Sequence, residues 1–323
     1  MKKLLVFLLI VAMLFSLTGC GMRNYSETGF FLDTVITITV YDDDNSSIEA
    51  AFNEIERLEK LLSNTISDSD VCRVNNSSGW VEISPEMQEI VEKSLNYYRL
   101  TGGAFDITIN PLTALWNVNG GGPVPSDSEI QNRLRMVDFT KVQLHDGSIY
   151  AGNNTEITLG GVAKGYIADK ICELLKENGV EHGIINLGGN VVVFGGDPDG
   201  GDYTVGIRDP FGSETDLIGT VSISNGTVVT SGAYERFFVE NDRIYHHIID
   251  PATGYPSDSG ISGVTIVAQD SALADALSTA VYIMGVQEGL ELIEALNDVE
   301  CIIIDDYGDI TLSSGMDDYF VGF

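Results

Sequence analysis

The chain is 323 residues long, with 44% hydrophobic residues, 20% charged residues and a formal net charge of −31 at pH 7. This length and composition suffice for a sizeable core, in one large domain or two modest ones. The excess of acidic residues disfavours nucleic-acid phosphates as partners, and an anionic small ligand would need a cation or backbone amides to hold it.

The first twenty residues have the features of a bacterial lipoprotein leader. Lys2 and Lys3 precede an apolar run over residues 4–17, which is too short for a stable membrane span. Small residues then precede Cys20, which resembles the bacterial lipobox. We expect residues 1–19 to be removed as a signal peptide and Cys20 to be lipidated. Residues 20–28 would then tether the remaining domain, 29–323, to the extracytoplasmic face of the cell membrane. An ordinary signal peptide with a coincidental cysteine is the alternative.

Hydrophobic periodicity predicts an α+β protein in which helices pack on antiparallel sheets. Residues 34–40 alternate as a strand, and several short strands follow between Gly183 and Val239. A closing hairpin is expected near residues 306–308. The expected helices cover residues 48–62, 85–100, 162–178, 272–285 and 287–296.

The cysteines beyond the leader are Cys72, Cys172 and Cys301. Their odd number and wide spacing argue against a disulfide framework or a thiolate metal site. They are therefore expected to be buried, small apolar residues.

Three glycine pairs interrupt the predicted elements. Residues 101–106, Thr-Gly-Gly-Ala-Phe-Asp, follow a helix, so the pair is either a helix C-cap or a place where the backbone approaches a flat ligand. Residues 159–166 place two glycines at a helix start with Lys164 close behind, which suits a phosphate or diphosphate but lacks the spacing of a Walker loop. Residues 186–190, Asn-Leu-Gly-Gly-Asn, are expected to form a tight bend whose asparagines could contact a ligand.

The predicted helix over residues 272–285 is apolar around nearly its whole circumference and should be buried. Asp275, Ser278 and Thr279 interrupt the apolar surface as one narrow stripe at i, i+3 and i+4. Oxygen donors of this kind suit Mg²⁺, because a buried carboxylate is costly unless it is paired. The alternative is a structural stripe satisfied by neighbouring backbone.

His247 stands at the end of a predicted strand, directly before the turn formed by Asp250-Pro251 and Gly254-Tyr255-Pro256. A histidine held in this way is either a proton acceptor near neutral pH or a hydrogen-bonded core residue. We interpret Asp250 as the residue that fixes the turn rather than as a catalytic acid.

Taken in order, these motifs resemble those of the ApbE family of FAD:protein FMN transferases. The resemblance extends from about residue 29 to the C-terminus and also includes Thr230–Arg236. It implies an ApbE-like, T-fold-related architecture, as one domain or as two subdomains around an FAD cleft. It also implies Mg²⁺-dependent transfer of FMN from FAD to a Thr or Ser hydroxyl of an acceptor protein, with release of AMP.

The resemblance assigns roles to single positions. His247 matches the histidine required for transfer, and Ile249 matches a backbone contact to FAD. The Gly161 carbonyl matches a magnesium ligand, with Asp275 and Thr279 as side-chain ligands and Ser278 nearby. The positions that match cofactor contacts are Ala104, Phe105, Asp106 and Lys164.

Three positions depart from the family's pattern. Leu32 stands where the family often has Met, Thr158 where an acid often precedes the glycine loop, and Thr65 where an aromatic is frequent. The last two changes put an FAD hydrogen bond and a stacking surface in doubt. The same residues would also serve an FAD pyrophosphatase that uses water as acceptor, and a lipoprotein that binds flavin without catalysis is the non-enzymatic alternative.

Overall fold

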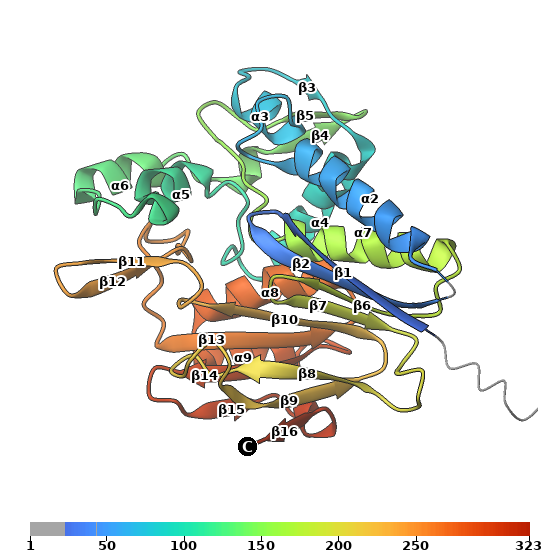
Figure 1. Cartoon of the computed structure of the whole chain (residues 1–323). Helices are drawn as coiled ribbons and strands as arrows, with labels where there is room; N and C mark the ends of the chain where they lie inside the picture. Colours follow the sequence, from blue (N-terminus) through green and yellow to red (C-terminus); the bar gives the residue numbers. More distant parts are fainter. Residues whose placement is uncertain (1–22, 43) are drawn as a thin grey trace, which may run out of the picture.

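The computed structural model describes residues 23–42 and 44–323 (Figure 1). Its centre is an eight-stranded sheet, antiparallel throughout, with the order β1-β2-β6-β7-β10-β13-β14-β15. These strands are β1 (Arg23–Phe31), β2 (Thr34–Asp42), β6 (His182–Leu187), β7 (Asn190–Phe194), β10 (Gly226–Gly232), β13 (Ile261–Ala268), β14 (Glu300–Asp305) and β15 (Ile310–Leu312).

Helices cover one face of this sheet. Helix α8 packs on β10 and β13, α7 lies beside α8, and α2 packs on α7 (Figure 1). The layer consists of α2 (Ser46–Leu62), α4 (Pro85–Leu100), α7 (Ala163–Glu177), α8 (Ser271–Met284) and α9 (Val286–Glu294).

A three-stranded sheet of β8 (Tyr203–Arg208), β9 (Leu217–Ile223) and β16 (Phe320–Gly322) covers the opposite face. Neighbouring residues of the central strands therefore enter different cores. On β10, Val229 packs with α8 while Val228 packs with β8 and β9. Successive side chains of a strand point to opposite faces, so a strand covered on both faces reads as a continuous apolar run.

Two smaller units stand beside the layers. Strands β3 (Val81–Glu82), β5 (Ser148–Tyr150) and β4 (Gln143–His145) form a small sheet near α3 (Asp70–Asn75) (Figure 1). Helices α5 (Asn110–Trp116) and α6 (Asp127–Leu134) share a separate apolar cluster with the hairpin of β11 (Phe237–Glu240) and β12 (Arg243–His246).

The predicted fold class is confirmed, and each of the five predicted helices is present within two residues of its expected ends. The predicted tether over residues 20–28 is wrong for residues 23–28, because these residues are part of β1 and pair with β2. This edge strand is mostly exposed and its sequence lacks a regular alternation of polar and apolar residues, so it resembles a linker. Helices α5 and α6 were missed because each is only two turns long. Residues 1–19 and Cys20 lie outside the described residues, so the leader and the lipidation site stay predictions.

The cysteine prediction is confirmed, since Cys72, Cys172 and Cys301 are free and buried. In the described part of the chain, none of the helices combines the length and apolar character that crossing a membrane requires.

Two helices approach closely where Gly165 of α7 meets the start of α8. A Cβ atom added to Gly165 would lie 2.1 Å from the carbonyl oxygen of Ser271. Asp169, one turn further along α7, accepts hydrogen bonds from the amides of Ser271 (2.9 Å) and Ala272 (3.0 Å). The glycine thus permits the approach, and the carboxylate caps α8.

We expect Gly165→Ala to lower the free energy of unfolding by about 1–3 kcal/mol, because the added methyl group forces the two helices apart. Urea unfolding monitored by circular dichroism measures the change. Gly79→Ala is the matched control and should unfold as the wild type does, since a Cβ there meets nothing within 4 Å. Equal stability of the two variants would contradict the close packing of α7 on α8.

Candidate active site between helix α7, helix α8 and the central sheet

The crossing of α7 and α8 brings three predicted site residues together. The Gly165 amide donates a 3.0 Å hydrogen bond to Oδ2 of Asp275 on α8. A Cβ atom on Gly161, just before α7, would lie 3.6 Å from Oγ1 of Thr279. Gly161, Asp275 and Thr279 therefore gather at the start of α7, although more than 110 residues separate Gly161 from Asp275 in the sequence.

Ser278 belongs to the same stripe but faces the sheet. Its hydroxyl lies 2.8 Å from that of Ser231 on β10 and donates to the Asp275 carbonyl at 2.9 Å. Ser278 is fully buried, so its visible role is to hold α8 against β10. The Thr279 hydroxyl, by contrast, is only partly buried.

The donors at this crossing fit a hard divalent cation. The Asp275 side chain is buried and makes no ion pair with a described lysine or arginine. A carboxylate, a hydroxyl and a backbone carbonyl are oxygen ligands that Mg²⁺ accepts, with waters and phosphate oxygens completing its shell. Among the described residues, no three or more His, Cys, Asp or Glu side chains are clustered so as to hold a metal. The carboxylate that this site offers is that of Asp275.

The segment from Ala104 to Asp106 packs beside the glycine loop. The Phe105 ring would lie 3.3 Å from a Cβ atom on Gly161, so a side chain at this position would crowd the ring. Asp106 is buried, and its Oδ1 accepts hydrogen bonds from the amide (2.7 Å) and hydroxyl (2.6 Å) of Thr108. Burial raises the pKa of Asp106, and the Thr108 hydrogen bonds oppose that rise.

Thr65 and Thr158, the two threonines that depart from the family's pattern, lie on adjoining loops. The side chain of Asn64, next to Thr65, donates to Oγ1 of Thr158 at 3.4 Å. The same Thr158 hydroxyl accepts from the Gly160 amide at 3.3 Å. Thr158 thus helps to shape the glycine loop, while Thr65 is exposed and bonds to Ser63.

Leu32 and Asp33 form the turn between β1 and β2, both with positive φ angles, of 54° and 56°. The Leu32 amide donates to Oε1 of Glu59 at 2.7 Å, which fixes the turn over α2. Asp33 lines two neighbouring cavities.

His247 follows directly after β12. Its amide donates to the Arg236 carbonyl at 3.1 Å, and ring Nδ1 lies 3.2 Å from the same oxygen. A carbonyl can only accept, so Nδ1 carries the proton and Nε2 keeps its lone pair. Desolvation, together with the positive charges of Arg236 and Lys164, lowers the pKa of His247 from 6.5 to about 4, although the hydrogen bond to the Arg236 carbonyl opposes the shift. The ring is therefore a neutral proton acceptor at pH 7.

The turn after His247 is built as predicted. Oδ1 of Asp250 accepts from the Ala252 amide at 2.8 Å, and its carbonyl accepts from Gly254 at 2.8 Å. Asp250 is an Asx-turn residue, so its place in the turn is confirmed. Ile249 pairs with Pro256 and buries its side chain with Leu112, so only its backbone is free to contact a ligand.

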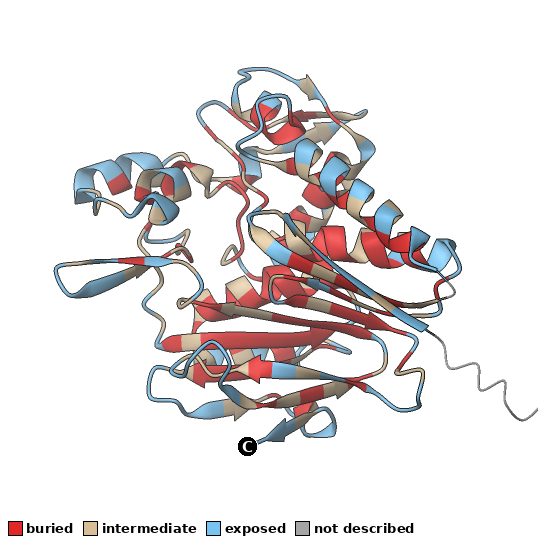
Figure 2. Cartoon of the chain, viewed as in Figure 1, coloured by how far each residue is buried: buried red, intermediate tan, exposed pale blue. Residues whose placement is uncertain are grey.

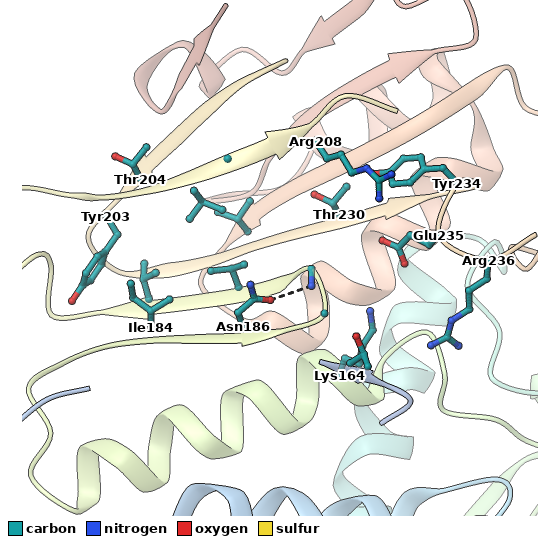
Figure 3. A pocket seen from close by; sticks show the side chains of 18 of the residues that line it. Lys164, Ile184, Asn186, Tyr203, Thr204, Arg208, Thr230, Tyr234, Glu235 and Arg236 are labelled. Atoms are coloured by element: carbon teal, nitrogen blue, oxygen red, sulfur yellow. Dashed lines mark hydrogen bonds between the residues drawn. The ribbon is translucent and has the colours of Figure 1, made fainter. Parts of the chain in front are cut away.

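A cavity of about 670 Å³ opens between Lys164 and strands β6, β7, β8 and β10. In Figure 3 the side chains of Lys164, Arg208 and Arg236 gather at one end of it, with Glu235 among them. The Arg208 guanidinium lies 4.7 Å from the centre of the Tyr234 ring. None of the three cations makes an ion pair with the acids that the structure describes. In so acidic a chain, these cations mark a place for an anion.

Sequence reasoning missed Arg208 and assigned no role to Glu235 or Arg236. Arg208 ends a short strand of the outer sheet, and only the stacking of two sheets brings it to Lys164. Burial raises the pKa of Glu235, whereas the nearby Lys164 and Arg236 lower it. The sequence of residues 230–236 could have indicated a binding segment, because the polar side chains of Tyr234, Glu235 and Arg236 come shortly after the end of a β-strand at Gly232.

Comparison with known proteins decides the family. The ApbE family model matches residues 32–303. This chain belongs to the ApbE family. The predicted resemblance is thereby confirmed over most of the sequence.

Individual ApbE proteins match over nearly their whole length. The chain is 33% identical to an FAD:protein FMN transferase of Klebsiella pneumoniae, with 90% of this chain and 92% of the relative covered. It is 31% identical to the FAD:protein FMN transferase of Treponema pallidum, covering 91% and 89%. The crystal structure of the ApbE protein from Thermotoga maritima superposes with a TM-score of 0.87 at 31% identity, covering 92% of this chain and 99% of that one. The flavin transferase ApbE from Vibrio cholerae gives 0.82 at 25% identity, with the same coverage.

We expect the His247 imidazole of the FAD-free ApbE protein to stay neutral well below its ordinary pKa of 6.5 and to protonate near pH 4. The unfolded chain takes up this proton near pH 6.5, so the stability that neutral His247 contributes is present above pH 6.5. It is lost as the pH falls from about 6.5 to about 4. Ring ¹⁵N chemical shifts followed from pH 7 to pH 4 report the titration. A midpoint near 6.5 would contradict a desolvated imidazole at this position.

Proposed function

We infer that this ApbE protein transfers FMN from FAD to an acceptor protein. The relatives named FAD:protein FMN transferases support the reaction, and one observation in this chain carries the chemistry. A neutral histidine with a free Nε2 binds the carbonyl of Arg236, which lines a cavity together with Lys164 at the start of α7. That combination is what phosphoryl transfer to a weak nucleophile requires.

The nucleophile in our proposal is a Thr or Ser hydroxyl of the acceptor. Its oxygen forms a bond to the FMN-side phosphorus of FAD, while the bond from that phosphorus to the AMP oxygen breaks and AMP leaves with the electron pair. Nε2 of His247 accepts the hydroxyl proton, and the hydrogen bond from Nδ1 to the Arg236 carbonyl keeps the imidazole oriented.

Lys164 would face the diphosphate. Val162, the N-cap of α7, provides no side-chain cap, but the Gly165 amide of the first turn binds the Asp275 carboxylate, so the Lys164 ammonium supplies the positive charge for a ligand. Lys164 stands two residues further on and lines the cavity. The flavin-contacting segment in this proposal is Ala104–Asp106, together with Leu32, Thr65, Thr158 and the Ile249 backbone.

We propose Mg²⁺ as the metal, held by the side chains of Asp275 and Thr279 and by the Gly161 carbonyl. Ser278 would support the site by fixing α8 to β10. Bound there, the cation would offset the charge of the diphosphate and of departing AMP. Gly165 orients the Asp275 carboxylate through its amide, which donates to Oδ2.

The lipid anchor on Cys20 and an extracytoplasmic location at the cell membrane complete the proposal. They rest on the sequence of the leader alone. Loss of membrane attachment in Cys20→Ser, measured by detergent-phase partition, tests them.

The central experiment incubates the protein with FAD, Mg²⁺ and candidate outer-surface proteins, followed by mass spectrometry. We expect a mass gain equal to FMN minus water on one Thr or Ser. His247→Ala should slow transfer by about 10²-fold or more while FAD affinity stays within a few fold, because the base is lost but the binding residues remain. His145→Ala, a change at an exposed histidine, is the control and should transfer normally.

The other outcomes separate the alternatives. AMP release without any protein adduct would identify an FAD pyrophosphatase that uses water as the acceptor. FAD binding with neither AMP nor adduct would identify a non-enzymatic flavin-binding lipoprotein. A flavinylated acceptor made by His247→Ala at the wild-type rate would overturn the role of the histidine.

The dependence of FMN transfer on Mg²⁺ tests the proposed metal site. EDTA should abolish FMN transfer and added Mg²⁺ should restore it. Asp275→Asn should raise the half-saturating Mg²⁺ concentration by about tenfold or more, because a carboxamide is a weaker ligand than a carboxylate. Asp317→Asn, at an exposed acid, should respond to Mg²⁺ as the wild type does. Transfer that is indifferent to EDTA would refute a metal at this site.

A further inference from the structure

The hairpin of β11 and β12 exposes an apolar face. Phe237, Val239 and Ile244 are 47%, 58% and 57% exposed, although large apolar side chains are normally buried. Val239 and Ile244 are cross-strand partners, and Phe237 lies two residues before Val239, so all three share one face of the hairpin. Figure 2 shows this hairpin as largely exposed.

The opposite face of the hairpin is already occupied. Phe238 and Tyr245 stack with ring centres 5.3 Å apart, and Tyr245 stacks on the buried Trp116 of α5 at 5.6 Å. This aromatic stack anchors the hairpin to the α5 and α6 unit. Within the residues that the structure describes, β11 and β12 pair only with each other, so each also keeps an open edge. The hairpin is thus held firmly while its apolar face and edges stay available.

The exposed face leads directly into the active site. The hairpin starts after Arg236 and ends before His247, and these two residues are joined by the hydrogen bond from the His247 amide to the Arg236 carbonyl. Phe237 itself lines a second cavity, of about 410 Å³. That cavity is also lined by Asp33, Val118, Asn119, Glu235 and Arg236.

We propose that the outer face of this hairpin is the docking surface for the acceptor protein, which brings its Thr or Ser hydroxyl to the second cavity, beside Arg236, whose carbonyl binds His247. The inference rests on the proposed function, because only a protein substrate needs binding surface beyond the reacting group. Lys164 and Arg208 at the larger cavity meet the charges of the dinucleotide, whereas an uncharged face suits a polypeptide. Apolar side chains and open strand edges are the features by which sheets bind extended protein segments.

The test compares two double variants of this chain. Their substrate is the acceptor protein identified by mass spectrometry, which is purified before its hydroxyl has been flavinylated. Val239→Ser with Ile244→Ser removes the apolar face. Val321→Ser with Ile310→Ser is the matched control, since those residues are 63% and 43% exposed but lie on other strands. In-gel flavin fluorescence measures transfer rates as the acceptor concentration is varied. We expect the hairpin variant to raise KM for the acceptor by about tenfold or more, with kcat and FAD affinity unchanged.

Each other result overturns the inference. Equal KM values for the hairpin and control variants would exclude this face as the docking surface while leaving the transferase intact. A wild-type protein that flavinylates no acceptor would refute the proposed function itself. If sedimentation shows a wild-type dimer that the hairpin variant no longer forms, the face binds a second copy of this chain instead.

Discussion

The contact between Gly165 of α7 and the start of α8 decides where the reactive groups lie. A residue with a side chain would collide there with the Ser271 carbonyl, so the two helices can approach only because the position is a glycine. The approach lets the Gly165 amide bind Asp275 and sets Thr279 beside Gly161. Asp169 secures the same crossing by capping α8. The absence of a side chain at Gly165 thus permits both the close packing of α7 on α8 and the arrangement of oxygen donors.

Electrostatics then separates the site from the rest of this acidic protein. With 48 acidic and 17 basic residues, the chain repels anions over most of its surface. Lys164, Arg208 and Arg236 are placed around one cavity without direct acidic partners. Glu235 lies among them and offsets part of their charge, and desolvation raises its own pKa. The cleft can therefore accept a dinucleotide diphosphate in a molecule that would otherwise exclude it.

The histidine links the site to the proposed acceptor surface. Its backbone and ring both bond to the Arg236 carbonyl, which closes the base of the β11–β12 hairpin. The aromatic stack of Trp116, Tyr245 and Phe238 holds that hairpin from behind. A protein bound to the outer face would thus contact an element whose two ends are the residues that orient the imidazole.

Local sequence determined much of this protein. The periodicity of the five long helices, the apolar strands, the Asx turn at Asp250 and the polar stripe of α8 all depend on residues close together in the chain, so they could be predicted. The family motifs likewise stand in the sequence itself. Tertiary structure alone decided that residues 23–28 join the sheet as β1, that Ser278 faces β10 while Thr279 faces Gly161, and that Arg208 reaches the cavity. It also decided that His247 is neutral, because desolvation depends on what surrounds the ring. Contacts between segments 110 residues apart, such as that from Gly165 to Asp275, arise from packing that no local pattern records.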